Sequence, residues 1–138
     1  MKRLFFISAI FTFLFAPFSK ANAETLINCK MTNYVASWND GDSGPKSPIQ
    51  DVIYKINFIK KEIYREITGK FVLIKDVNFS DNQISWTSKY ETMVSDYVIN
   101  RLSGIHTENT YFDKATAKKI GLIKTKTIYN CSATKQKF

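Results

Sequence analysis

The chain of 138 residues has one histidine, His106, and two cysteines, Cys29 and Cys131. Because it lacks a second histidine and a spare cysteine, it lacks the ligand sets of zinc sites, and we expect no metal or other cofactor. The two cysteines stand near opposite ends of the chain rather than in a C-x-x-C spacing, which excludes the usual redox-active pair.

The long apolar run at residues 4–16 ends at Pro17 and is too short for the roughly 20 residues that cross a bilayer. Two basic residues, Lys2 and Arg3, precede the run, and the small residues of Ala21-Asn22-Ala23 follow it. This order predicts a cleaved signal peptide over residues 1–23. We therefore expect a periplasmic or secreted protein with no transmembrane segment after cleavage.

The charge of the chain is +8, and residues 24–138 contain 17 basic and 12 acidic residues. Such a modest excess favours a weak attraction to envelope polyanions, whereas a dedicated nucleic-acid binder is more densely basic. Export also argues against a nucleic-acid partner. A segment of this size predicts a single domain over residues 24–138.

Cys29 and Cys131 are expected to form a disulfide, because an exported chain with two cysteines enters an oxidising compartment. The bond would close a loop of about 100 residues and stabilise the fold by roughly 4 to 5 kcal/mol in the chain-entropy treatment. Residues 24–138 are thus predicted to form one disulfide-closed β-domain.

Apolar residues alternate with polar ones along most of the chain after residue 24, which indicates antiparallel β-structure. Ile27, Cys29 and Met31 share one face of a first strand, and alternate residues from Ile123 to Cys131 share one face of a last strand. The alternation predicts an all-β fold, a small antiparallel barrel or sandwich of about seven or eight strands.

Between the two ends, residues 52–59 and 71–79 are predicted strands, with hairpin turns at Ser80–Asn82 and Ser103–Gly104. Residues 113–121 favour one short helix, capped by Asp113 and ended by Gly121. The pattern of residues 59–69 fits a strand or a helix, and we favour the strand.

Residues 33–50 contain two glycines and two prolines with little periodicity, and are predicted to form a long loop. Aromatic residues in such a loop are candidates for an exposed contact with a ligand or a protein partner. Tyr34 and Trp38 are therefore the candidate ligand contacts.

His106 follows the second hairpin turn and alternates with Ile105, so the two side chains should face opposite ways. We predict that His106 is an ordinary surface or rim residue and assign no catalytic residue. The alternative is a small periplasmic or secreted hydrolase that uses His106 and neighbouring carboxylates.

Four lysines in the last third of the chain are candidate anion contacts: Lys118, Lys119, Lys124 and Lys126. Lys124 and Lys126 fall on one face of the predicted last strand, where they would present a row of ammonium groups to a polyanion. The simpler interpretation is that lysines protect edge strands from pairing and keep the protein soluble.

The segment Tyr97-Val98-Ile99-Asn100-Arg101-Leu102-Ser103-Gly104, followed by a C-terminal cysteine, resembles small uncharacterised exported bacterial β-proteins. The resemblance implies a compact β-fold and bacterial export, without an activity. The expected architecture is also similar to that of periplasmic lysozyme inhibitors, although Ser103-Gly104 is not followed by their tyrosine. We therefore expect an exported, non-enzymatic binding or envelope-accessory protein, with the hydrolase and the lysozyme-inhibitor-like protein as alternatives.

Overall fold

A computed structural model of the chain describes residues 24–39, 41–43 and 50–134. The predicted signal peptide, residues 1–23, and residues 44–49 of the predicted loop lie outside the described residues. The elements are β1 (Glu24–Trp38), β2 (Gly41–Ser43), β3 (Val52–Asn57), β4 (Glu62–Ile67), β5 (Lys70–Leu73), β6 (Asn78–Phe79), β7 (Gln83–Lys89), β8 (Met93–Asn100), β9 (Ile105–Phe112), α1 (Lys114–Ile120) and β10 (Leu122–Ala133).

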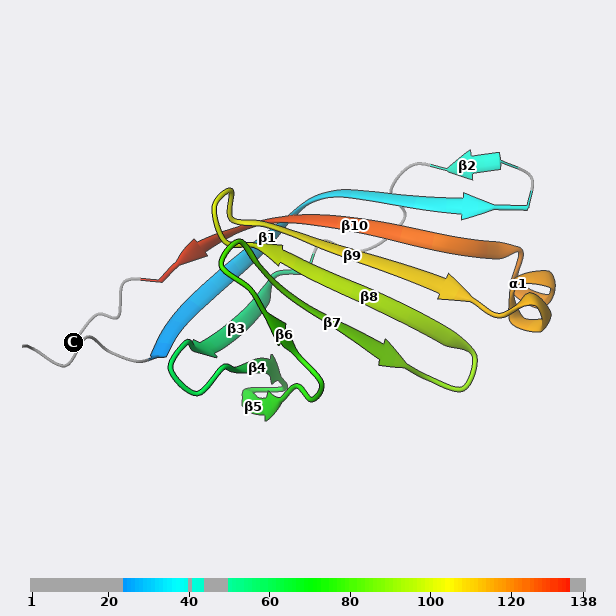
Figure 1. Ribbon diagram of the computed structural model, residues 1–138. Coiled ribbons are helices and arrows are strands. Elements are labelled where there is room, and N and C mark those ends of the chain that lie inside the picture. Colours follow the sequence, from blue (N-terminus) through cyan, green and yellow to red (C-terminus); the bar gives the residue numbers. More distant parts are fainter. Residues whose placement is uncertain (1–23, 40, 44–49, 135–138) are drawn as a thin grey trace, which may run out of the picture.

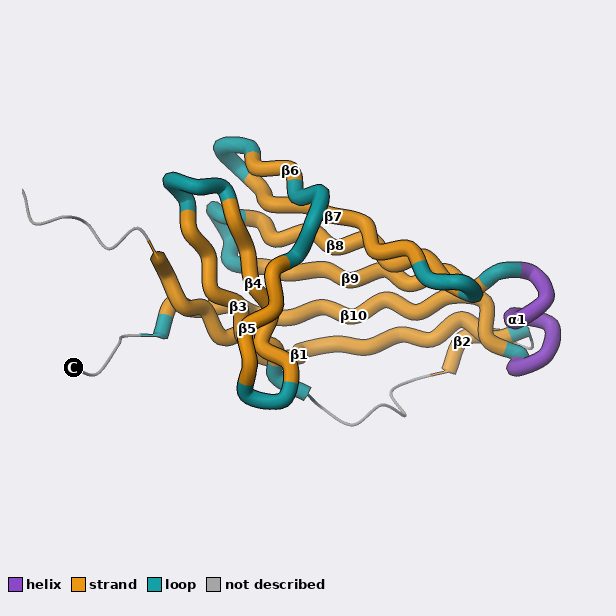
Figure 2. Tube along the Cα trace, turned by 90° about the horizontal axis from the view of Figure 1, so that it is seen from below, coloured by secondary structure: helices purple, strands orange, loops and turns teal. Residues whose placement is uncertain are grey.

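The strands form one antiparallel sheet in the order β5-β4-β3-β1-β10-β9-β8-β7-β6, with β2 paired to β1 off this path. The all-β antiparallel fold and the short helix are therefore confirmed. In Figure 1 the long strands β1 and β7–β10 lie side by side, and α1 lies at their right-hand end. Figure 2 shows that β3, β4 and β5 curl across the other end, which makes the sheet a half-barrel.

The two edges of the half-barrel, β5 and β6, are joined by only residues 74–77. The five Cα–Cα steps from Leu73 to Asn78 reach at most about 18 Å, so this link holds the two edges close together. Ile74 and Val77 within it pack against the core. The predicted single strand over residues 71–79 is wrong, because the chain turns at Asp76, which has a φ of 55°.

The core lies between β3–β4 and the long strands, where apolar and aromatic side chains from both parts meet. Its buried members are Cys29, Val52, Tyr54, Ile56, Ile63, Ile84, Trp86, Tyr97, Ile99 and Tyr129. Cys29 on β1 stands directly opposite Cys131 on β10, and the two form the predicted disulfide. Since the Cys131 amide donates to the Gly104 carbonyl on the other side (2.8 Å), the two cysteines form a non-hydrogen-bonded pair, in which side chains approach closely.

The predicted loop over residues 33–50 is wrong for residues 33–38, which belong to the long strand β1. The register between β1 and β10 shifts between Met31 and Asn33, as at a β-bulge. The shift moves the inward positions from Cys29 and Met31 to Tyr34 and Ala36. The alternation of inward and outward residues is therefore interrupted at the bulge. Together with the glycines and prolines that follow, this interruption led to the prediction of a loop over the whole segment.

The strand predicted over residues 52–59 ends at Asn57, because residues 58–61 form a turn. The remaining local predictions are confirmed. Residues 62–67 form a strand, and the turns at Ser80–Asn82 and Ser103–Gly104 each join two strands of a hairpin. The Asp113 carboxylate accepts a hydrogen bond from the Thr116 amide at the start of α1 (2.8 Å), and Gly121 ends the helix with a φ of 77°.

Candidate ligand pocket at the mouth of the half-barrel

A pocket of about 370 Å³ opens where the β4–β5 hairpin and the β5–β6 link face β7 and β8. Rings from the core, Trp86 and Tyr97, form part of its wall. Apolar side chains that are about half exposed surround them, including Ile67, Val72 and Leu73. The volume lies within the range of ligand sites in proteins. Polar side chains, among them Thr87 and Ser88, complete the wall.

Arg65 on β4 is the charged group at the inner side of this pocket. Its side chain is half-buried, and among the described residues it forms no salt bridge. Lys75 and Lys89 also line the pocket, against the single carboxylate of Asp76. The pocket therefore has an excess of positive charge beside apolar walls, which suits an anionic group on a mainly apolar molecule.

A series of aligned rings crosses the sheet from β7 to β10. Trp86 stacks on Tyr97 at a centroid distance of 4.9 Å and an interplanar angle of 7°, and His106 stacks on Tyr129 at 5.0 Å and 21°. Tyr54 on β3 meets Trp86 and His106 edge to face. Stacked and edge-to-face contacts between rings stabilise the fold beyond the burial of the rings themselves. The rings hold one another in place, so Trp86 and Tyr97 give the pocket a rigid wall.

His106 is fully buried within this series, and our prediction of a surface or rim residue is wrong. It does face away from Ile105, as expected, but Ile105 is the exposed member of the two. The cause is the register: His106 stands opposite Ile99 and Tyr129, whose side chains face the core.

The two ring nitrogens of His106 are both engaged. Nδ1 lies 3.2 Å from the Val98 carbonyl, which only accepts, so Nδ1 carries the proton. Nε2 then accepts a hydrogen bond from the Tyr54 hydroxyl at 3.1 Å. Burial lowers the pKa of His106 to about 4. His106 is thus a neutral structural residue in this fold, with no free nitrogen to offer a molecule in the pocket.

Glu108 is the acidic group of the inner face, two residues after His106 on β9. Burial raises its pKa, although the charge of Arg65 and hydrogen bonds from Tyr97 and Tyr129 act in the opposite direction. The Tyr129 hydroxyl donates to Glu108 Oε2 over 3.5 Å. Burial also raises the pKa of Tyr97, and that of Tyr129 to about 12. These groups form a polar layer beside the pocket.

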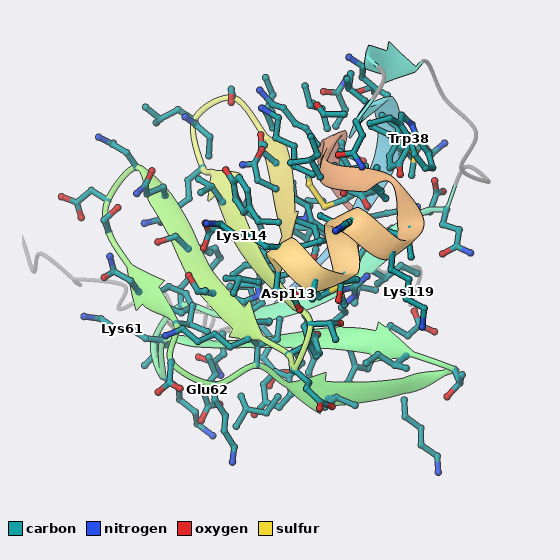
Figure 3. The ribbon with its side chains drawn as sticks, turned by 90° about the vertical axis from the view of Figure 1, so that its right-hand side faces the viewer. Trp38, Lys61, Glu62, Asp113, Lys114 and Lys119 are labelled. Carbon is teal, nitrogen blue, oxygen red and sulfur yellow. A yellow bond between two sulfur atoms is a disulfide. The ribbon has the colours of Figure 1, made fainter. Side chains whose placement is uncertain are left out.

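Tyr34 and Trp38, the predicted ligand contacts, lie on β1 and are both half-buried. Neither lines the pocket at the mouth of the half-barrel. Trp38 lies at the same end of the molecule as α1, as Figure 3 shows, and its Nε1 is buried without a partner among the described residues. The structure therefore separates these two residues from Arg65 and the pocket.

The four candidate lysines divide into two pairs. Lys124 and Lys126 line a smaller cavity of about 220 Å³ on the outer face of the sheet, together with Ser37, Asn109 and Tyr111. Lys118 and Lys119 lie in the last turn of α1 and are exposed, and Figure 3 shows Lys119 at that end of the molecule. Only the strand pair is thus combined with polar neighbours in one cavity.

No group of three or more histidine, cysteine, aspartate or glutamate residues in the described ranges is arranged to hold a metal ion. None of the helices described is long and apolar enough to cross a membrane. Comparisons of the chain with protein-family models, curated proteins and solved structures find no match. The resemblances noted for residues 97–104 and for lysozyme inhibitors therefore stay predictions.

Arg65 is the functional candidate that sequence reasoning missed. It lies in the segment that fitted a strand or a helix, and as a strand residue it shares the inward face with Ile63 and Ile67. A basic residue on the apolar face of a strand was the available signal, because an arginine is rarely placed inward without a partner.

Proposed function

We propose that this protein is an exported, non-enzymatic binding protein whose half-barrel pocket takes a small amphipathic anion. The apolar body of such a molecule would lie against the half-exposed side chains of Ile67, Val72 and Leu73. Its carboxylate, sulfonate or phosphate would accept hydrogen bonds from the Arg65 guanidinium.

One observation carries this proposal: Arg65 lies half-buried in a pocket with apolar side chains on its wall and has no salt-bridge partner among the described residues. An arginine stays charged at any physiological pH, and removing part of its hydration is costly unless an anion or other acceptors replace the lost water. Glu108 lies within electrostatic reach on the inner face but forms no ion pair with it. A bound anion would supply the missing charge.

The test uses two dyes with the same aromatic body, 8-anilinonaphthalene-1-sulfonate and the uncharged N-phenyl-1-naphthylamine. We expect saturable one-to-one binding of both dyes to the purified, oxidised protein, measured by dye fluorescence. The change Arg65→Gln removes the charge with little change in length. It should weaken binding of the sulfonate dye by about 10-fold, or about 1.4 kcal/mol, and leave binding of the uncharged dye unchanged.

Lys55→Gln is the matched control, because Lys55 lies on the neighbouring strand β3, is partly buried like Arg65 and does not line the pocket. It should leave both affinities unchanged. Equal affinity of wild type and Arg65→Gln for the sulfonate dye would refute the proposal. So would an equal loss for both dyes, since that result indicates a changed pocket shape rather than a lost anion contact.

A second candidate function, binding of an envelope polyanion, is favoured by the cavity that combines Lys124 and Lys126 with Ser37, Asn109 and Tyr111. No acidic residue lines this cavity. Lys124→Gln with Lys126→Gln should lower the salt concentration that elutes the protein from an anionic matrix, by more than Lys118→Gln with Lys119→Gln does. Equal effects of the two pairs would indicate a response to net charge alone.

A further inference from the structure

Three turns meet at the end of the half-barrel opposite α1. They are the β3–β4 turn (residues 58–61), the β6–β7 turn (80–82) and the β8–β9 turn (101–104). Figures 1 and 2, taken from directions 90° apart, both place them at this end, which we call the turn end.

Arg101 ties the three turns together. Its guanidinium carbon lies 4.8 Å from the ring centre of Phe58 in the β3–β4 turn. Its Nη1 donates to the Ser80 carbonyl (2.9 Å), and its amide donates to the Asn82 carbonyl (2.8 Å), both in the β6–β7 turn. The turn end is therefore one connected surface rather than three separate loops.

Asparagine side chains fix the shape of two of these turns. Asn57 Oδ1 accepts from the Lys60 amide (2.9 Å), and Asn100 Oδ1 accepts from the amides of Leu102 (3.0 Å) and Ser103 (2.9 Å). Such bonds hold a turn in one conformation. The side chains at the tips are consequently displayed without a large loss of entropy on binding.

The tips of these fixed turns carry aliphatic side chains in water. Ile59 is 78% exposed and Leu102 is 80% exposed, and Phe58 beside them is 38% exposed. Exposed basic residues adjoin both tips, Lys60 and Lys61 in the first turn and Arg101 in the second, whereas Asp81 is the one acid within the three turns. The turn end thus combines apolar tips with a positive rim.

We infer that the turn end docks onto a bilayer that contains anionic phospholipid. Ile59 and Leu102 would enter the boundary between headgroups and acyl chains, and the lysines would remain at the level of the phosphates. Aliphatic side chains and Lys or Arg on one surface are the combination that holds proteins at anionic membranes. A protein interface fits less well, because lysine is depleted in such interfaces.

The inference is independent of the proposed pocket, since none of the residues of the three turns lines it. It is tested by flotation of the oxidised protein with vesicles of phosphatidylethanolamine and phosphatidylglycerol. We expect the protein to float with these vesicles and to stay in the bottom fraction with vesicles of phosphatidylcholine alone. Binding should weaken as salt is added, because the ion atmosphere screens the lysines.

Two double variants separate the apolar from the electrostatic part. Ile59→Ser with Leu102→Ser, and Lys60→Gln with Lys61→Gln, should each lower the vesicle partition coefficient by about 10-fold. The matched controls are Ile123→Ser, a half-exposed aliphatic residue on β10, and Lys118→Gln with Lys119→Gln on α1. Both controls should bind like wild type.

The depth of entry is tested by Leu102→Trp, whose emission should shift to the blue on vesicle binding and be quenched by brominated lipid. The inference is overturned if the wild-type protein stays in the bottom fraction with anionic vesicles, which is the outcome expected of a protein-docking surface. It is equally overturned if the α1 lysine pair lowers binding as much as the Lys60 and Lys61 pair, since binding would then follow net charge.

Discussion

The burial of His106 predicts that the protein loses stability in mildly acidic solution. His106 is the one histidine of the chain, and both of its ring nitrogens are engaged within a closed aromatic environment. Protonation in the native state would place a charge among Trp86, Tyr97 and Tyr129 and bring a proton onto the nitrogen that accepts from Tyr54. The folded protein therefore resists protonation, whereas the unfolded chain does not.

The sign and size of this effect of pH on stability follow from the pKa of His106 in the native protein and in the unfolded chain. The native pKa is about 4 and the ordinary value is 6.5, so between these values the unfolded state binds more protons. The contribution of His106 to the free energy of unfolding is fully present above pH 6.5 and is lost as the pH falls toward 4. It amounts to about 3 kcal/mol in all, of which about 2 kcal/mol is lost between about pH 7.5 and about pH 5.

Other titratable groups near His106 also affect how stability changes with pH. The effect of His106 must therefore be measured as a difference between two proteins. Glu108 has a raised pKa, so its effect opposes that of His106: it stabilises at low pH and is lost as the pH rises. Tyr54, Tyr97 and Tyr129 have raised pKa values and stay neutral throughout this range, and Arg65 stays charged. The assay is therefore urea unfolding of wild type and His106→Gln at both pH values, because the variant keeps every other group.

We expect the free energy of unfolding of wild type to fall by about 2 kcal/mol more than that of His106→Gln over this range. A ¹⁵N NMR titration of the native protein provides a check that needs no variant. It should show a neutral ring with the proton on Nδ1 throughout. A native His106 that titrates near its ordinary pKa, or equal pH dependence of the two proteins, would show the reasoning to be wrong.

Two further predictions concern stability. Replacing both cysteines, by Cys29→Ala with Cys131→Ala, should lower the free energy of urea unfolding by about 4 kcal/mol, because the bond spans 102 positions; a loss below about 1 kcal/mol would contradict the loop-entropy account. Gly104→Ala should cost about 2 to 3 kcal/mol, because φ is +70° and the new Cβ would stand 2.8 Å from the Cys131 carbonyl oxygen. Gly69→Ala is its control, at φ +79° with nothing within 4 Å, and should cost only about 1 kcal/mol; equal losses would rule out the close contact as the cause.

Local patterns predicted most of the β-structure, because each depends on neighbouring residues. The cap at Asp113, the helix end at Gly121 and both hairpin turns follow from short-range chemistry and are confirmed. The disulfide between Cys29 and Cys131 could also be predicted, because the chain has only two cysteines and the alternation places both on the inward face of their strands. The failures arose where one residue changed the period, at the bulge after Met31 and the turn at Asp76.

The candidate site was much less predictable than the strands. Arg65 and Trp86 meet at one pocket only because the link between β5 and β6 brings the two edges of the sheet together. Strand order is a long-range property that alternation does not encode. The alternation correctly predicted that the side chains of His106 and Ile105 face opposite ways. Polarity alone predicted the more exposed position for His106, whereas His106 is buried and Ile105 is exposed.

The place of β10 in the sheet has a consequence for how the chain matures. It lies between β1 and β9, so the last of the described strands along the chain occupies the centre. Until β10 arrives, β1–β3–β4–β5 and β6–β9 form two fragments, and each has an additional bare backbone edge, at β1 and at β9, that invites pairing with another molecule. We therefore expect the sheet to be completed only after synthesis of the C-terminal strand, so that truncation before Leu122 yields a chain that associates rather than folds.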